Sequence, residues 1–550
     1  MSFIKEYDDL NFQYNSDFWK LFVSQKVINN TSFEKFEEFV TEKDIPVYLL
    51  LQEINICQKY QIFIKKLLLS DPKKFELLVD KYDSVENPKF YLPNNISKEE
   101  INEWAEKYCD LKDAELKHLE KISKWSLHHE VKLDSTVKLK AKKAHEDMIE
   151  EIFKDNKGIG WGVGVILKNG LSDNFEFNEN DRTKMVVTFN KDWLDDNQDY
   201  PTILNNFIYF FELFNSKLQF SMIESPYEQG GLTDLFRTKS KYYYKQSYTA
   251  DLGISFYKLT FLSYYDYLVS EKIDLENVFS YYYNNLLDEE YGFSEFFFNP
   301  STKGNTYYER CKILIPEMDS LLKQFDFLQR YGKIDFELFE LESQNTPYRD
   351  IKSLKNKKFI YINSSEAIKM CNLFFNSQSL LSFPEHKKNK NNFYEYLISG
   401  IKVEDFYPYQ KHMIEVLVEQ DVLEIDEKNN LIIKNRKLIE LYWLLWDKGY
   451  LSILSVPEDI KEMIQSEILK GNLKVENTLF SKQKSDYISF VMDNKKFSNG
   501  LFIRNKITHG SFANKEESEY KNYYLELLLV LLLYTVRINE ELDCSNENLL

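Results

Sequence analysis

The chain has 550 residues, more than one hydrophobic core usually serves, so several domains are expected. Its formal net charge of −18 argues against a broad surface that coats nucleic acid or docks on an anionic membrane, although a local basic groove remains compatible with it. Five scattered cysteines without a CxxC pair disfavour a disulfide framework or a zinc knuckle and favour a reducing, cytoplasmic setting.

The chain is predicted to be mainly α-helical, because it contains only 16 glycines and 12 prolines. The N-terminal sequence does not read as a signal peptide. The most apolar run, residues 525–536, contains Glu526 and is shorter than the roughly 20 residues that a membrane helix needs. We therefore expect a buried core helix there and no membrane partner.

Residues 1–155 are predicted to form a helical N-terminal domain, because apolar residues recur at helical spacing. The expected helices cover residues 17–27, 33–42, 47–69 and 101–127. The region also contains four histidines: His118, His128, His129 and His145. HEDMIEE lacks the second histidine of HExxH, and the adjacent His128 and His129 point apart. We favour solvated helix faces here and predict neither a metal nor another cofactor.

Residues 156–195 are predicted to be a small β-rich segment. Gly158, Gly160, Gly162 and Gly164 alternate ahead of a predicted strand at 163–168, and a second strand is expected at 185–189. The glycines lead into a strand and not into a helix N-terminus, which disfavours a phosphate-binding loop. A β-meander or a small insertion is the favoured interpretation.

Residues 196–345 are predicted to be an aromatic-rich helical domain in which most rings form core. One segment interleaves cations with aromatic rings, and its candidate RNA-binding residues are Lys239, Lys241, Tyr243 and Lys245. Such a pattern can stack single-stranded bases and hold the backbone. The alternative, which we favour, is a helix face whose long side chains extend to solvent.

Residues 346–455 are predicted to be a mixed, winged-helix-like module. A short strand is expected within 355–362, a helix at 407–419, a hairpin from 421–426 and 431–434, and a helix at 437–446. No basic recognition helix accompanies this pattern, so a scaffold role is favoured over DNA binding.

Residues 456–550 are predicted to be a helical bundle with helices at 458–469, 486–492, 500–508 and 516–541. The last helix is apolar on almost every side, so it must be buried within a bundle or a dimer.

The sequence NGLFIRNKITHG, residues 499–510, is predicted to contain a short helix that Ser498 or Asn499 caps and Gly510 ends. It places Arg504, Asn505 and His509 in one neighbourhood. Arginine offers a fork of donors that matches phosphate oxygens, and histidine titrates near neutral pH. Asparagine can orient the histidine or donate to a ligand.

RNKITHG resembles the Arg-x4-6-His signature of HEPN domains, and more closely a group of proteins with a C-terminal RNxxxHG motif. The resemblance is confined to residues 456–550. It implies a HEPN-like helical bundle and a metal-independent ribonuclease that acts as a homodimer, with Arg504 and His509 as the catalytic pair and Asn505 beside them.

The resemblance further implies RNA as the partner, with tRNA or another structured RNA as candidates, and a toxin-like anti-phage role under a regulatory protein partner. One alternative is a non-catalytic RNA- or nucleotide-binding protein. Another is a structural or interaction scaffold, in which His509 caps its helix and Arg504 pairs with Glu516, Glu517 or Glu519.

Overall fold

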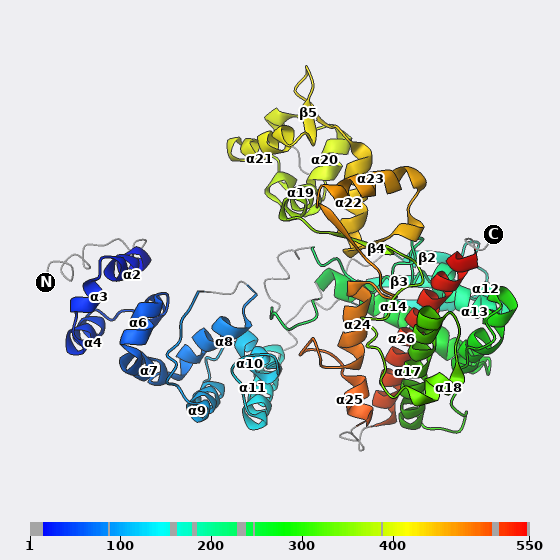
Figure 1. Cartoon of the computed structure of the whole chain (residues 1–550), viewed down its shortest axis with the longest axis horizontal. Helices are drawn as coiled ribbons and strands as arrows, with labels where there is room; N and C mark the ends of the chain where they lie inside the picture. Colours follow the sequence, from blue (N-terminus) through cyan, green and yellow to red (C-terminus); the bar gives the residue numbers. More distant parts are fainter. Residues whose placement is uncertain are drawn as a thin grey trace. The chain divides into compact units, whose positions relative to one another are not determined.

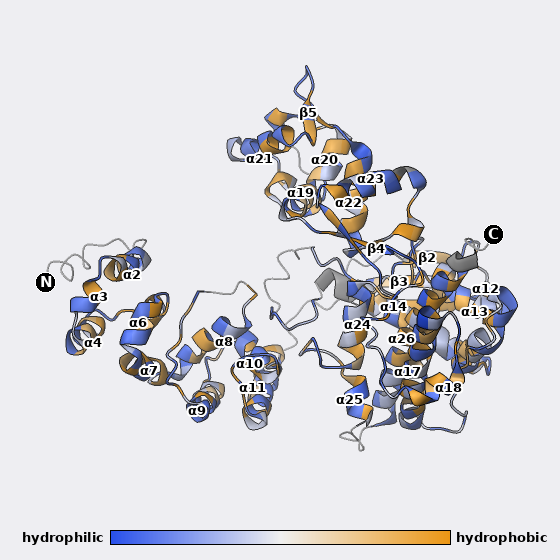
Figure 2. Cartoon of the chain, in the orientation of Figure 1, coloured by the Kyte–Doolittle hydropathy of each residue, from blue (hydrophilic) through white to orange (hydrophobic). Residues whose placement is uncertain are grey.

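The computed structural model describes residues 15–85, 89–154, 162–178, 184–227, 238–245, 248–386, 389–508 and 516–546 (Figure 1). Its described part is mainly helical with small sheets, which confirms the predicted class. Most helices combine hydrophobic and hydrophilic residues, as expected of elements that bury one side (Figure 2).

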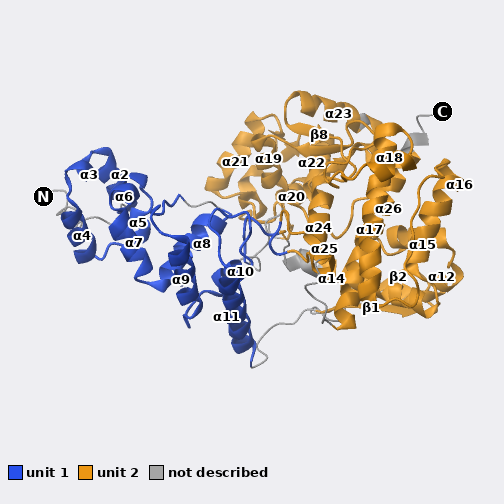
Figure 3. Ribbon diagram, turned by 60° about the horizontal axis from the view of Figure 1, so that its bottom comes forward, with its two compact units in different colours: residues 1–158, 237–243, 497–499 blue, residues 159–236, 244–496, 500–550 orange. Residues whose placement is uncertain are grey.

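The chain forms two compact units (Figure 3). Unit 1 comprises residues 1–158, 237–243 and 497–499, and unit 2 comprises 159–236, 244–496 and 500–550. The boundary predicted at residue 155 lies close to the end of the long part of unit 1. The finer division of the later residues into four domains stays a prediction.

Unit 1 is built from short helices around an aromatic core. In chain order they are α2 (Asn15–Ser24), α3 (Val27–Asn30), α4 (Phe33–Glu42), α5 (Val47–Leu50), α6 (Ile54–Lys59), α7 (Gln61–Leu69), η2 (Pro72–Lys74), α8 (Phe75–Asp83), α9 (Lys98–Cys109), α10 (Leu116–Ser123) and α11 (Ser135–Phe153). Ser97 and Glu100 form a reciprocal capping box at the start of α9. In the core, Phe36 stacks on Tyr60 with 3.7 Å between ring centroids.

Two long helices expected in unit 1 are broken into shorter ones. The stretch 47–69 forms α5, α6 and α7, because Glu53 is extended and Tyr60 also leaves the helical region of φ and ψ. The stretch 101–127 forms α9 and α10, which are separated by a short connection after Asp110.

The expectation of solvated histidines is wrong for two of the four. His118 is 8% exposed and His129 is 2% exposed. His129 stacks on Trp125, and its Nε2 lies 2.8 Å from Asp83 Oδ1. Periodicity alone did not reveal that these imidazoles are buried beside carboxylates from other parts of the chain.

The predicted β-rich segment of unit 2 is a three-stranded sheet in the order β1-β3-β2, formed by β1 (Gly162–Lys168), β2 (Phe175–Asn178) and β3 (Lys184–Asn190). β1 pairs parallel with β3, so the sheet is not a meander. A Cβ on Gly164 would lie 3.2 Å from Val186 Cγ2, which explains a glycine at this close approach. Gly158 and Gly160 lie outside the described residues.

A second sheet in unit 2 has the order β7-β4-β8, formed by β4 (Phe359–Ile362), β7 (Leu451–Ser452) and β8 (Leu473–Glu476). All four residues of β4 are buried, as suits a central strand. The predicted hairpin is confirmed as β5 (Leu423–Ile425) and β6 (Leu431–Ile433).

Helices make up most of unit 2. The first half contains α12 (Lys191–Asp196), α13 (Tyr200–Asn205), η3 (Asn206–Phe210), α14 (Tyr248–Ser270), α15 (Leu275–Tyr281), η5 (Tyr282–Leu286), α16 (Leu287–Tyr291), α17 (Tyr307–Tyr331) and α18 (Phe336–Leu341). The second half contains α19 (Ser365–Phe375), η6 (Leu380–Ser382), α20 (Phe393–Ser399), η7 (Val403–Asp405), α21 (Pro408–Glu419), α22 (Arg436–Lys448), η8 (Ile453–Ser455), α23 (Glu458–Leu469), α24 (Lys482–Met492), α25 (Ile503–Thr508) and α26 (Glu517–Asn546).

The closing helix α26 lies at the centre of unit 2, where α17 and α24 pack against it (Figure 1). Every side chain from 527 to 538 is buried, which confirms the expected core helix. Burial on all sides explains why this helix shows no apolar stripe.

A buried cluster of charges attaches α26 to the β4 sheet. Glu541 accepts hydrogen bonds from Ser353 Oγ at 2.8 Å and from the Leu354 N–H at 2.7 Å, and it pairs with Lys358. Glu540 Oε2 lies 3.1 Å from Lys358 Nζ. These contacts neutralise each carboxylate that the fold takes out of water.

We predict that Glu541→Gln destabilises unit 2 by about 3–5 kcal/mol, because it leaves the Lys358 ammonium buried without its closest counter-charge. Calorimetric unfolding of the full chain measures the change. Asp543→Asn, at an exposed acid on the same helix, is the matched control. An unfolding temperature for Glu541→Gln equal to that of the control would contradict a stabilising role.

We also predict that the free energy of unfolding decreases in acid, because the Glu540 carboxylate becomes protonated there. Burial alone would raise the pKa of this carboxyl, but the charges of Arg537, Lys358 and Lys484 outweigh burial and lower the pKa to about 2. A depressed carboxyl pKa stabilises the fold above the unfolded value of 4.5. That contribution, about 3 kcal/mol, is lost as the pH falls from about 4.5 to about 2.

Measuring the free energy of unfolding between these pH values for the wild type and Glu540→Gln tests this linkage. The variant is expected to lose stability less steeply with falling pH. Parallel curves for the two proteins would show that Glu540 carries no such linkage.

Candidate functional site

The RNxxxHG segment begins in a short helix that packs against the core of unit 2. Ile503 and Ile507 of α25 are buried at 0% and 2% exposure, as their i, i+4 spacing predicts. The residue before α25, Phe502, has φ of 55°. A Cβ on Gly500 would lie 2.5 Å from the Phe490 carbonyl oxygen, so only glycine lets the chain pass this point.

α25 begins at Ile503, so neither of the predicted N-terminal caps, Ser498 and Asn499, is at the N-cap position. The Ser498 N–H donates to the Tyr242 carbonyl at 2.9 Å, and both residues belong to unit 1, as does Asn499. The first helical hydrogen bond is instead made by the Lys506 N–H to the Phe502 carbonyl at 3.0 Å. The predicted C-terminal residue of the helix, Gly510, lies outside the described residues.

Arg504 forms an ion pair with Asp319 of α17 through its Nη2. The acids proposed from the sequence as its partners lie on or just before α26, and one of them, Glu517, accepts a hydrogen bond from the Tyr307 N–H at 2.5 Å. Burial raises the pKa of Asp319, and the Arg504 charge only partly opposes this. Among the described residues, the buried Nε of Arg504 has no hydrogen-bond partner.

Arg504 lines a cavity of about 220 Å³ with three other basic residues. The described residues of the lining are Asp319, Leu322, Lys323, Asn345, Thr346, Pro347, Tyr348, Arg349, Lys495 and Arg504. Among them Asp319 is the single acid, so this lining is locally cationic in a chain whose net charge is −18.

Two of the cationic groups of this cavity contact other parts of the protein. Lys323 Nζ donates to the Phe339 and Glu342 carbonyls at 2.6 and 2.7 Å. Arg349 is exposed, and its guanidinium lies 5.6 Å from the Tyr348 ring centroid. Cations gathered around a concave surface suit a phosphate group or another small anion.

Of the two residues predicted to act with Arg504, Asn505 does not line this cavity. Asn505 Nδ2 donates to Asn494 Oδ1 at 2.9 Å on an exposed part of the surface, and Asn505 is not in the cavity lining. His509 lies outside the described residues, so its approach to Arg504 stays a prediction.

The segment of interleaved cations and aromatics is not a helix, contrary to expectation. Lys239, Lys241 and Tyr243 belong to unit 1, whereas Lys245 belongs to unit 2. The Tyr243 hydroxyl donates to the Glu120 carbonyl at 3.4 Å, and Lys124 Nζ lies 5.6 Å from its ring centroid. Burial raises the pKa of Tyr243. Its ring is therefore used in packing, and RNA binding by this segment stays a prediction.

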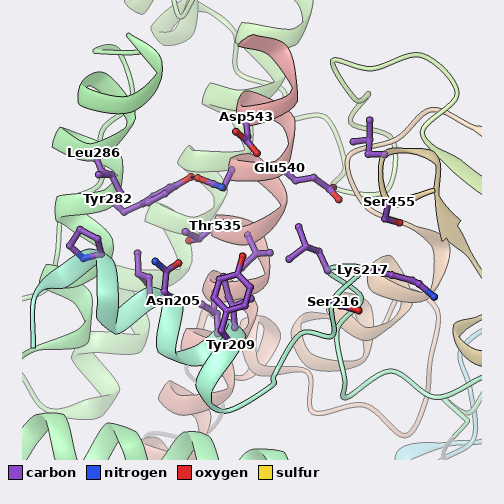
Figure 4. Close-up of a pocket in the computed structure, with 18 residues that line it drawn as sticks. Asn205, Tyr209, Ser216, Lys217, Tyr282, Leu286, Ser455, Thr535, Glu540 and Asp543 are labelled. Atoms are coloured by element: carbon purple, nitrogen blue, oxygen red, sulfur yellow. Dashed lines mark hydrogen bonds between the residues drawn. The ribbon is translucent and has the colours of Figure 1, made fainter. Parts of the chain in front are cut away.

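A second cavity, of about 370 Å³, was not anticipated (Figure 4). Two π-helical turns, η3 and η5, contribute to its lining with α26. Figure 4 shows Tyr209, Tyr282 and Lys217 around it, and burial lowers the pKa of Lys217. No pattern in the sequence indicated these π-helical turns, which depend on tertiary packing.

Comparison of the chain with family models, curated proteins and solved structures finds no match. Within the described residues, no helix combines the length and the apolar character needed to cross a membrane.

Proposed function

We propose that the protein is a HEPN-like, metal-independent endoribonuclease in which Arg504 and His509 are the catalytic pair. The observation that carries this proposal is the cationic cavity at the motif arginine, with Lys323, Arg349 and Lys495 in its lining. A guanidinium and further cations around one concavity are suited to the phosphodiester of a single RNA linkage.

In the proposed reaction, the ribose 2′-oxygen attacks the adjacent phosphorus, and the bond from phosphorus to the 5′-oxygen breaks. His509 takes the 2′-hydroxyl proton as general base or supplies a proton to the leaving 5′-oxygen as general acid. Arg504 stabilises the negative charge that builds on the phosphate oxygens. A homodimer would supply the second histidine that acid and base catalysis together require.

In this proposal, the ion pair between Arg504 and Asp319 is the state of the site before RNA binds. Arg504 Nη2 is already paired with a carboxylate, so an RNA phosphate must displace Asp319 or share the guanidinium with it. Burial raises the pKa of Asp319, so its charged form is less favoured than that of a solvated carboxyl and depends on the Arg504 charge.

Two alternatives use the same residues. In a non-catalytic RNA- or nucleotide-binding protein, Arg504 would hold a phosphate without cleaving the chain. In a structural scaffold, the Arg504–Asp319 pair would only join α25 to α17, and this pair is the observation that favours that alternative.

The proposed biological setting is that of a cytoplasmic anti-phage toxin acting on tRNA or another structured RNA. The remainder of the chain would then serve as sensor or restraint, and a regulatory protein would hold the nuclease inactive.

We predict that His509→Ala folds normally and lowers RNA cleavage at least about 100-fold, because it removes the proton-transfer group. Purified protein is incubated with total RNA in the presence of a chelator, and fragments are measured. His412→Ala, at an exposed histidine of unit 2, is the matched control. Wild-type cleavage by His509→Ala would reject the assigned site.

We predict that Asp319→Asn tightens RNA binding about fivefold, because it removes the carboxylate that competes with phosphate for Arg504. Binding is measured with the His509→Ala background to prevent cleavage. Asp266→Asn is the control, because Asp266 is also paired with a cation, Lys521, at 2.7 Å. A loss of stability without any change in RNA affinity would instead support the scaffold alternative.

A further inference from the structure

Two neighbouring helices of unit 1 place three carboxylates around one histidine. α8 carries Glu76 and Asp80 at i and i+4, so both lie on one face of that helix. Glu115, at the N-cap of α10, and His118, in its first turn, are spaced i and i+3 and so share a face. Contacts between these two helices bring the four side chains together.

One of the two ring nitrogens of His118, Nε2, has a carboxylate partner that orients the imidazole. Its imidazole is largely buried, and Nε2 lies 3.2 Å from Asp80 Oδ1. A proton on Nε2 that is donated to Asp80 leaves an unprotonated Nδ1. A carboxylate that fixes the tautomer in this way is the usual partner of a metal-bound histidine.

The other imidazole nitrogen faces a carboxylate without forming a hydrogen bond. Within the part of the chain that the structure describes, the buried Nδ1 has no hydrogen-bond partner, although Glu115 Oε2 lies only 3.0 Å away. A nitrogen lone pair and a carboxylate oxygen repel each other at this separation unless a cation lies between or beside them. A first-row metal ion bound to both atoms would attract each of them and so hold them at a similarly short separation.

One tyrosine orients the Glu76 carboxylate and also contacts the backbone of Glu115. The Tyr108 hydroxyl donates to Glu76 Oε1 at 2.9 Å and accepts from the Glu115 N–H at 3.0 Å. Only one oxygen of Glu76 is used in this hydrogen bond, so the other remains able to act as a ligand.

We propose that Glu76, Glu115 and His118 form a binding site for a divalent transition metal, with Zn²⁺ as the best-suited ion, and that Asp80 holds the histidine in place. The candidate ligand atoms of the three residues lie within 4.8 Å of one another. Ligands of a tetrahedral zinc ion are about 3.4 Å apart, so a small rotation of the glutamate side chains completes the site.

The choice of ion follows from the ligands. An imidazole nitrogen with two carboxylates suits Zn²⁺, whereas Mg²⁺ and Ca²⁺ prefer shells made only of oxygen. Three protein ligands leave one position open, and the Glu115 carboxylate is exposed, so this position faces solvent. The site belongs to unit 1 and is separate from the proposed metal-independent nuclease of unit 2.

The competing explanation is a protonated His118 that bridges two carboxylates without a metal. In that case Nδ1 would carry a proton toward Glu115, and the cluster would be an internal ion-pair network. Lys121, whose Nζ lies 3.9 Å from Asp80 Oδ1, would add a second positive charge to this network.

The test is calorimetric titration of the chelator-treated full chain with zinc sulfate. The wild type is expected to bind one Zn²⁺ that His118→Ala does not bind. Glu115→Gln is expected to weaken binding at least about tenfold and to fold normally, since the Glu115 side chain is 58% exposed. Cobalt loading should give the visible absorption of a tetrahedral site in the wild type and not in His118→Ala.

His412→Ala is the matched control, because His412 Nδ1 lies 3.7 Å from Glu415 Oε2 at an exposed i, i+3 pair without further ligands in the cluster. This variant should bind Zn²⁺ like the wild type. Equal zinc binding by the wild type and Glu115→Gln, or none by the folded wild type, would overturn the proposal. The second result would support the protonated-histidine network.

Discussion

The burial of α26 is the constraint on which the architecture of unit 2 depends. A helix with no solvent-facing side from 527 to 538 must be surrounded, and α17 and α24 pack against it. Charges near its C-terminal end cannot remain unpaired in this environment, so Glu541 is satisfied by Ser353, the Leu354 N–H and Lys358. One helix thereby connects the β4 sheet with the helices that carry the candidate site.

The candidate site follows from the same packing. α25 is only six residues long and is held by two buried isoleucines, while α17 supplies Asp319 opposite Arg504. The cavity beside Arg504 is cationic although the whole chain is strongly acidic. An acidic surface disfavours non-specific binding of nucleic acid, so a local concentration of positive charge would restrict where an RNA phosphate can bind.

The sequence predicted the elements whose signal is local. The hairpin of β5 and β6, the short strand β4 and the buried closing helix were all expected from alternation, turn residues and apolar content. Helix breaks at Glu53 and Tyr60 were missed, because apolar spacing continues through them. The parallel pairing of β1 with β3 was missed as well, since pairing partners are set by tertiary contacts.

The candidate site was predicted only in part. The motif placed Arg504 beside the closing helix, and its buried isoleucines were correctly identified. Its partner Asp319 lies 185 residues away in sequence, so no spacing rule could identify it. The carboxylates around His118 were missed for the same reason, because Asp80 and Glu76 come from a different helix.

The central claim is that Arg504 opens onto a cavity that accepts an RNA phosphate. A crystal structure of the His509→Ala variant with a short RNA tests it most directly. The account predicts a phosphate oxygen about 3 Å from the Arg504 guanidinium, with Asp319 displaced from the ion pair. A complex in which the RNA lies elsewhere, while Arg504 remains paired with Asp319, would contradict the account.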